Sequence, residues 1–148
     1  MADNLKFKVR HATSEDLSQL IPLLSQLTTV GYPSRSAINP TIYNNIYVLY
    51  QEDKNTIVGT ITVLIEPKII HNGGSVAHVE DVVIDQNYRK MGLGKVLLDH
   101  AISIAKKERC YKVILDCDKD NIGFYEKSSF KQKGVCMRLD LSDRLDRF

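Results

Sequence analysis

The sequence has 148 residues, 43% hydrophobic and 26% charged, a balance typical of one globular domain rather than of a disordered chain. A formal net charge of +2 is too small for a protein that neutralises nucleic-acid phosphates. The three cysteines lack the paired spacing of a zinc site, and no apolar stretch approaches the roughly 20 residues of a membrane span. We therefore expect a single domain over residues 1–148 in the cytoplasm, with no metal, no nucleic acid and no membrane partner.

The first half of the chain predicts a strand, a helix and an antiparallel hairpin. Strict alternation of apolar residues over 5–12 is typical of a strand. Apolar residues over 17–28 then recur at helical spacing, and Pro22 among them predicts a kink or an early end. The glycine and prolines of 31–40 favour only short helical pieces. The hairpin strands are expected over 46–51 and 57–66.

The second half predicts a β-α-β crossover, a short helix and a closing strand. The clearest helix, over 92–107, has an apolar stripe that includes Val96, and the strands on either side of it should be parallel neighbours. In the strand over 76–85, alternation places one set of side chains on a common face: His78, Glu80, Val82 and Ile84. The other expected elements are a turn at 71–74, a buried parallel strand at 112–117, a helix at 121–127 and a closing strand at 135–141. The expected fold class is α/β, with a mixed, mostly antiparallel sheet and helices on both faces.

One segment before the clearest helix has the pattern of an anion site. Arg89-Lys90-Met91-Gly92-Leu93-Gly94-Lys95 places two glycines and three cations at a helix N-terminus, where free amides and the helix dipole attract phosphate. Arg89 and Val96 exclude a Walker loop, and Leu97 replaces the third glycine of a dinucleotide fingerprint. The remaining pattern, Arg-x-x-Gly-x-Gly after a strand, is that of the pyrophosphate loop of acyl-coenzyme A N-acetyltransferases. A plain glycine turn that caps a helix is the alternative.

Three further blocks make this pattern more specific: HVEDVVI at 78–84, CYKVILDC at 110–117 and NIGFYEK at 121–127. With LTTVG at 27–31 and KIIH at 68–71, they resemble the amino-sugar branch of the GNAT superfamily of N-acetyltransferases. The resemblance covers residues 5–139, nearly the whole chain. It implies a GNAT fold, acetyl-CoA as co-substrate and the amine of D-glucosamine 6-phosphate as acceptor. It also implies a homodimer whose sugar-phosphate site is shared between subunits, and a product that feeds UDP-N-acetylglucosamine synthesis.

The resemblance assigns three residues to catalysis. Glu80 would take the proton of the amine, Asp116 would hold the amine, and Tyr125 would protonate the leaving thiolate. The residues by themselves also allow a surface glutamate, a structural ion pair and a packed tyrosine. Attack would be direct, within a ternary complex, because no cysteine or serine stands in a nucleophile–base arrangement.

The other site residues implied by the resemblance form two groups. The coenzyme would bind Val82, Val83, Ile84, Arg89, Lys90, Met91, Gly92, Leu93, Gly94, Lys95, Asn121, Tyr125, Glu126 and Lys127. The acceptor would bind Thr28, Lys68, Ile69, Ile70, His71, Glu80, Asp81, Val82, Tyr111, Lys112, Asp116 and Arg138. Arg138 is included because the family's phosphate-binding arginine aligns with Asp140 here, and Arg138 lies two residues earlier on the expected strand.

Two other functions stay open at this point. The same fold could acetylate another small amine or a peptide, and the absence of an arginine at Asp140 bears on this choice of acceptor. A non-catalytic acyl-CoA-binding module would keep the loop alone. The joint presence of Glu80, Asp116 and Tyr125 argues against such a module.

Overall fold

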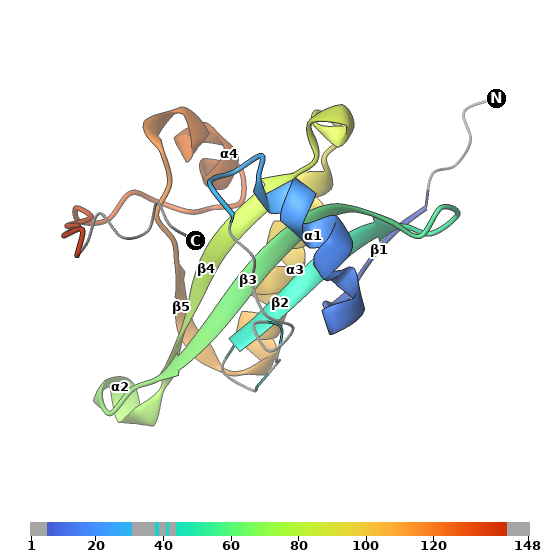
Figure 1. Cartoon of the computed structure of the whole chain (residues 1–148). Helices are drawn as coiled ribbons and strands as arrows, with labels where there is room; N and C mark the ends of the chain where they lie inside the picture. Colours follow the sequence, from blue (N-terminus) through green and yellow to red (C-terminus); the bar gives the residue numbers. More distant parts are fainter. Residues whose placement is uncertain (1–5, 31–37, 39–40, 42–43, 142–148) are drawn as a thin grey trace.

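The computed structural model describes residues 6–30, 38, 41 and 44–141, and within them one five-stranded sheet has the order β1-β2-β3-β4-β5 (Figure 1). The helices and strands in chain order are β1 (Phe7–His11), α1 (Leu17–Leu24), β2 (Asn44–Gln51), β3 (Thr56–Pro67), α2 (Ile70–Gly73), β4 (Ser75–Ile84), α3 (Leu93–Lys107), β5 (Cys110–Ile114) and α4 (Ile122–Glu126). Neighbouring strands are antiparallel except β4 and β5, which are parallel. The predicted α/β fold with one crossover is therefore confirmed.

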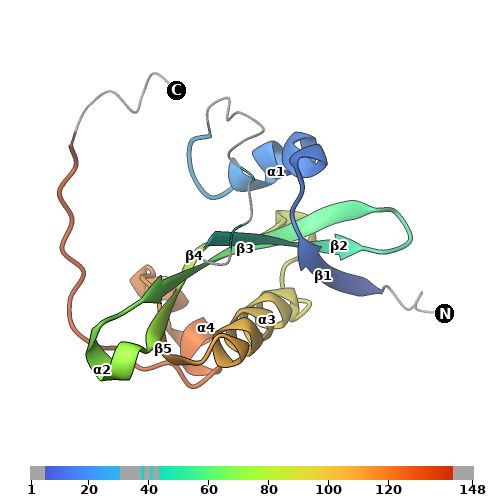
Figure 2. The same cartoon turned by 90° about the horizontal axis from the view of Figure 1, so that it is seen from below.

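Helices cover both faces of the sheet: α1 lies on one face, and α3 and α4 lie on the other (Figure 2). The larger hydrophobic core lies on the α3 side of the sheet, where Leu97 is fully buried. A second core on the α1 side includes Leu20 of α1 and Val48 of β2. Each such side chain contributes about 1.5–3 kcal/mol on burial, which fixes the helices against the sheet. Val96 is exposed and Leu98 is buried instead, so the prediction for Val96 was wrong. Val96 lies about a third of a helical turn from the centre of the buried stripe of α3.

Most elements of the first half are confirmed. Helix α1 follows a 3₁₀ turn over Ser14–Asp16 and ends at Leu24, two residues after Pro22, which is the predicted early end. The hairpin of β2 and β3 also forms as predicted. The helical pieces expected at 31–40 lie outside the described residues except for Ile38.

Strand β4 contains a β-bulge that reverses the predicted alternation. Between Glu80 and Val83 it has two residues, Asp81 and Val82, opposite a single residue of β3, and Asp81 has a left-handed φ of 50°. Val82 and Ile84 consequently pack on the α3 side, whereas Asp81 turns toward α1. The prediction that Val82 and Ile84 share a face with Glu80 was wrong, because one inserted residue exchanges the two faces beyond it.

The C-terminal part differs most from the prediction. Strand β5 is an edge strand that ends at Ile114, which is 39% exposed, so a buried strand reaching Cys117 was wrong. No strand forms at 135–141: the described residues 131–141 run as an extended segment clear of the sheet (Figure 2), with Val135 86% exposed. A strand needs a neighbour for its backbone groups, and this segment pairs with none of the described strands.

Candidate active site

The parallel strands β4 and β5 separate halfway along β4. Their pairing ends at His78 and Ile114, so residues 79–84 have no strand partner on the β5 side within the described ranges. The bulge at Asp81 bends β4 at the same point. The backbone of 82–84, predicted to bind the coenzyme, therefore lies along an open strand edge. An extended ligand can hydrogen-bond to such an edge as another strand would.

The predicted pyrophosphate loop stands at the N-terminus of α3. Its turn uses two left-handed residues, Lys90 with φ 63° and Gly92 with φ 75°, and Gly92 is the N-cap. The first amides of a helix have no partners within it, so they face outward at the positive end of the helix dipole. Leu93 can contribute only its backbone, because its side chain is buried in the core. The Arg89 side chain donates from Nε to the Ile84 carbonyl at 3.1 Å and fixes the start of the loop.

Helix α4 packs directly against this loop. A Cβ on Gly94 would lie 3.1 Å from the ring of Phe124, and that ring packs edge-on against Tyr125 with centroids 4.9 Å apart. Burial chiefly raises the pKa of the Tyr125 phenol, and the nearby Cys117 thiol adds to the effect. Gly94 of the loop and Tyr125 thus both pack against the ring of Phe124. The other predicted coenzyme residues nearby are exposed: Met91, Lys95, Asn121, Glu126 and Lys127.

Three carboxylates come together where β4 and β5 separate. Glu80 precedes the bulge, Asp81 lies in it, and Asp116 follows the end of β5 by two residues. Partial burial raises the pKa of the Glu80 carboxyl most, the charges of Asp81 and Asp116 raise it further, and His78 acts weakly in the opposite direction. Asp116 also raises the pKa of the Cys136 thiol, first by its charge and then by a hydrogen bond. A carboxylate with a raised pKa is a stronger base, as proton transfer from an amine requires.

A second group of predicted residues lies at the other end of β5. The ring of His71 packs on Tyr111 with centroids 4.3 Å apart, and the Lys112 Nζ is 5.7 Å from the centroid of the same tyrosine ring. His71 belongs to the single turn labelled α2, where its φ of 52° confirms the predicted tight turn rather than a regular helix. Lys68 forms an ion pair with Glu66, and Glu66 also bonds to His78 through Nε2 at 2.7 Å. The last predicted residues of this turn are exposed: Ile69 and Ile70.

These two groups lie apart within one chain. Lys112 and Asp116 are four residues apart, which corresponds to about 13 Å along an extended chain. Arg138 lies in the 131–141 segment and pairs with Asp140 at 2.6 Å, with both side chains largely exposed. The structure therefore brings the predicted catalytic carboxylates together and places the predicted phosphate ligands away from them, with Arg138 separate from the other cations.

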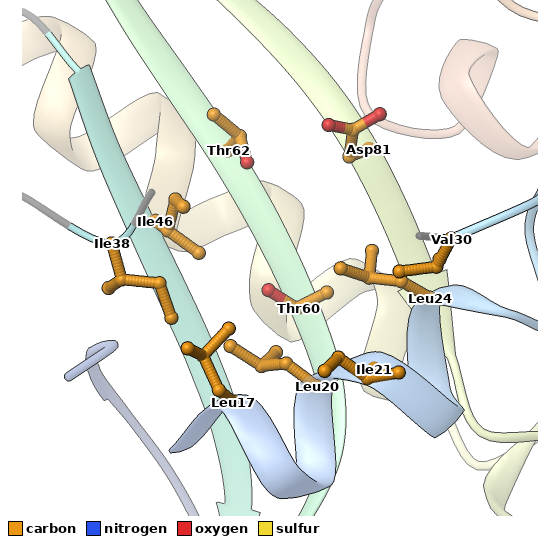
Figure 3. A pocket seen from close by; sticks show the side chains of 10 residues that line it. All are labelled: Leu17, Leu20, Ile21, Leu24, Val30, Ile38, Ile46, Thr60, Thr62 and Asp81. Atoms are coloured by element: carbon orange, nitrogen blue, oxygen red, sulfur yellow. The ribbon is translucent and has the colours of Figure 1, made fainter. Parts of the chain in front are cut away.

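An apolar cavity of about 120 Å³ lies between α1 and the sheet, beside Asp81 (Figure 3). The chain after α1 carries Thr28 and returns to line this cavity through Val30. Thr60 and Thr62 also line the cavity, and sequence reasoning missed both. The signal was present, since these are hydroxyl side chains in the apolar middle of the strand.

The described part of the chain contains no cluster of three or more His, Cys, Asp or Glu side chains that could hold a metal ion. It also contains no helix that is long and apolar enough to cross a membrane.

A split mixed sheet, a helix N-terminus that can attract phosphate and carboxylates at the split together fit a transferase that takes an acyl group from a phosphate-bearing coenzyme. The chain belongs to the acetyltransferase (GNAT) family, whose sequence model matches residues 18–130. Acetyltransferases of this family use acetyl-CoA as co-substrate.

Proteins similar to this chain show which branch of the family it resembles. A protein of Trypanosoma brucei brucei named glucosamine 6-phosphate N-acetyltransferase is 35% identical over 149 residues, which cover 95% of this chain and 100% of that protein. One of the same name from Candida albicans is 36% identical over 129 residues, or 81% and 85% of the two chains. The crystal structure of glucosamine-6-phosphate N-acetyltransferase from Arabidopsis thaliana has a TM-score of 0.85 at 33% identity, covering 93% of this chain and 99% of that one. The resemblance drawn from the sequence is confirmed.

Proposed function

We propose that the protein transfers the acetyl group of acetyl-CoA to the amine of D-glucosamine 6-phosphate, giving N-acetyl-D-glucosamine 6-phosphate and CoA. The observation that carries this proposal is the meeting of Glu80, Asp81 and Asp116 beside the open edge of β4. Carboxylates attract the cationic amine of an amino sugar, and relatives that match over most of the chain bear this enzyme's name. The further assignments to UDP-N-acetylglucosamine synthesis and to the cytoplasm rest on the resemblance alone.

The reaction needs a neutral amine first and a proton for the thiolate afterwards. Asp116 holds the ammonium group, and Glu80 takes its proton, directly or through water. The amine nitrogen then attacks the thioester carbon, so that a C–N bond forms, the C–S bond breaks and the nitrogen loses its second proton to solvent water. A backbone amide of 82–84 stabilises the oxyanion formed in this step. The Tyr125 phenol, whose raised pKa keeps it protonated, gives its proton to the departing sulfur.

We propose that a second copy of the chain completes the acceptor site. Lys68, His71 and Lys112 would bind the phosphate, yet Lys112 is about 13 Å along the chain from Asp116. The exposed 131–141 segment carries an alternating apolar series: Val135, Met137, Leu139 and Leu141. A homodimer would bury this series and bring the cations of one subunit to the carboxylates of the other.

Mixing two impaired variants tests this sharing. The first is Lys68→Ala combined with His71→Ala, and the second is Asp116→Ala. If the site is shared, each mixed dimer has one intact site, so random mixing by co-expression should restore about a quarter of wild-type turnover. If each subunit holds a complete site, both sites of every mixed dimer are damaged and activity does not return.

The acceptor is tested with glucosamine and its 6-phosphate. A bound phosphate supplies orientation and binding energy, so unphosphorylated glucosamine should have a kcat/KM at least about 10²-fold lower, equivalent to roughly 2.7 kcal/mol. Asp116→Ala should lower the turnover of both sugars. Equal use of the two sugars by the wild-type enzyme would reject the sugar-phosphate assignment.

One observation favours a second class of acceptor. Arg138, expected to replace the family's phosphate-binding arginine, has its charge offset by Asp140. A small amine or a peptide without phosphate is therefore the second candidate, and faster acetylation of a polyamine or peptide panel would select it. Arg138→Ala with an unchanged preference for the phosphorylated sugar would show that Arg138 does not bind the phosphate.

A further inference from the structure

Gln26 joins the chain after α1 to the end of β4. Its Nε2 donates to Asp85 Oδ2 at 3.1 Å, and its Oε1 accepts from the backbone N–H of Gln86 at 2.9 Å. Gln26 follows the last residue of α1 by two positions, and Asp85 immediately follows β4. One side-chain amide thus connects two segments that are 59 residues apart in sequence.

Asp85 is held in place independently of Gln26. Its backbone N–H donates to the carbonyl of Val58 at 2.7 Å, and its Oδ1 accepts from the backbone N–H of Asn87 at 2.8 Å. The segment from Asp85 leads directly into the predicted pyrophosphate loop. Loss of the Gln26 side-chain amide would therefore disconnect the turn after α1 from the end of β4 while leaving the loop anchored.

The turn after α1 leads to Thr28 and Val30, which lie on the side of the site proposed for the acceptor. The Thr28 N–H donates to the Leu24 carbonyl at 3.1 Å, so the turn after α1 continues through Gln26 to Thr28. Two residues later, Val30 lines the cavity beside Asp81 (Figure 3). The two side-chain hydrogen bonds of Gln26 consequently connect the turn that carries Thr28 to the end of β4.

We infer that Gln26 is a positioning residue for the acceptor, holding Thr28 and Val30 at a fixed place beside Asp81 and the coenzyme loop. This inference rests on the proposed function, because Thr28 contacts the acceptor only if the protein acetylates glucosamine 6-phosphate as proposed. Gln26 itself needs no contact with either substrate. The affinity of a site for its substrate depends on such supporting contacts, because they hold the contacting residues in place.

Steady-state kinetics of Gln26→Ala in the full chain test the inference. With both hydrogen bonds lost, the KM for glucosamine 6-phosphate should rise about tenfold while kcat falls less than about threefold. The KM for acetyl-CoA should stay within about twofold, because Asp85 keeps its other bonds. Gln26→Glu keeps the length of the side chain but places a carboxylate against Asp85. The same rise in KM in Gln26→Glu excludes lost packing as the cause, and a wild-type KM there would overturn the inference.

Gln19, which lies within α1, provides a matched control. Its Nε2 donates to the Asn55 carbonyl at 3.3 Å and its Oε1 accepts from the Ile57 N–H at 2.8 Å, at the turn between β2 and β3. Gln19→Ala likewise removes one donated and one accepted hydrogen bond of a glutamine amide, and it should leave both KM values unchanged. Equal acceptor KM values in Gln26→Ala and Gln19→Ala would refute the inference. A wild-type enzyme that fails to acetylate glucosamine 6-phosphate would instead refute the proposed function.

Discussion

Alanine at Gly94 tests whether the coenzyme loop and Tyr125 are mechanically linked. The new Cβ would stand 3.1 and 3.2 Å from the Cζ and Cε2 atoms of Phe124, and 3.9 Å from Cγ1 of Ile84. Carbon atoms in contact rest at about 3.5–4.0 Å. The Phe124 ring must therefore move away by roughly half an ångström.

This displacement reaches the phenol of Tyr125. The two rings pack edge-on at 4.9 Å, and Tyr125 packs in turn on Phe130 at 5.9 Å, so it has a neighbour on each side. A misplacement of about 1 Å can cost about 10²-fold in rate, so half of that predicts a kcat about tenfold lower. Overpacking of this kind should also lower the free energy of unfolding by about 1–3 kcal/mol.

Gly92→Ala separates this effect from simple damage to the loop. A Cβ there meets nothing within 4 Å, but the φ of 75° makes any side chain strained by about 1–2 kcal/mol. We expect Gly92→Ala to raise the KM for acetyl-CoA and to leave kcat largely unchanged, whereas Gly94→Ala should lower kcat. Urea unfolding and steady-state kinetics measure both variants. A wild-type kcat in Gly94→Ala, or an equal loss in Gly92→Ala, would refute the link.

Two other substitutions test the chemistry and the pH dependence. Tyr125→Phe keeps the ring packing and removes the proton donor, so kcat should fall by about 10²–10⁴-fold with little change in acetyl-CoA affinity, and a kcat within threefold of wild type would leave Tyr125 a packing residue. The Arg10 guanidinium is bonded to Asp16 at 2.7 and 2.9 Å and is the main cause of the lowered pKa of that carboxyl. The ionised Asp16 therefore stabilises the fold fully above the pKa of an ordinary aspartate, and this stabilisation is lost as the pH falls through the lowered pKa. Asp16→Asn should therefore lower the free energy of unfolding by about 1.5–3 kcal/mol at neutral pH, and urea unfolding should show the gap to wild type narrowing below about pH 4. A gap that does not change with pH would contradict this.

The sequence predicts those elements whose signal is local. The apolar spacing of α3 and the two apolar runs of the β2–β3 hairpin depend only on neighbouring residues, and both elements form as expected. The bulge at Asp81 is different, because it is a property of the register between two strands. The order Val-Glu-Asp-Val-Val from Val79 to Val83 departs from strict apolar–polar alternation, but it does not show which residue is inserted.

The candidate site could be predicted in part for the same reason. Glu80 and Asp116 interrupt apolar runs, which is a local signal, and the structure places their carboxylates near each other. The placement of Arg138 depended on a closing strand, and a strand depends on a partner that local sequence does not reveal. The ion pair of Lys68 with Glu66 joins residues two apart at the end of β3, a spacing that places side chains on one side of an extended chain. The roles of these residues and the single-domain boundary at 1–148 stay predictions.

The bulge links the stability of the fold to the chemistry of the site. In a regular strand Asp81 would point into the α3 core, among side chains such as Leu97 and Ile61 that have no exposed area. An unpaired carboxylate in such surroundings is strongly destabilising, whereas a left-handed φ is one that aspartate tolerates better than most residues. The insertion therefore exchanges a large desolvation penalty for a small backbone strain. It also places Asp81 on the side of Glu80 and leaves Val82 and Ile84 to anchor the strand on α3, so the same residue that protects the core assembles the carboxylates.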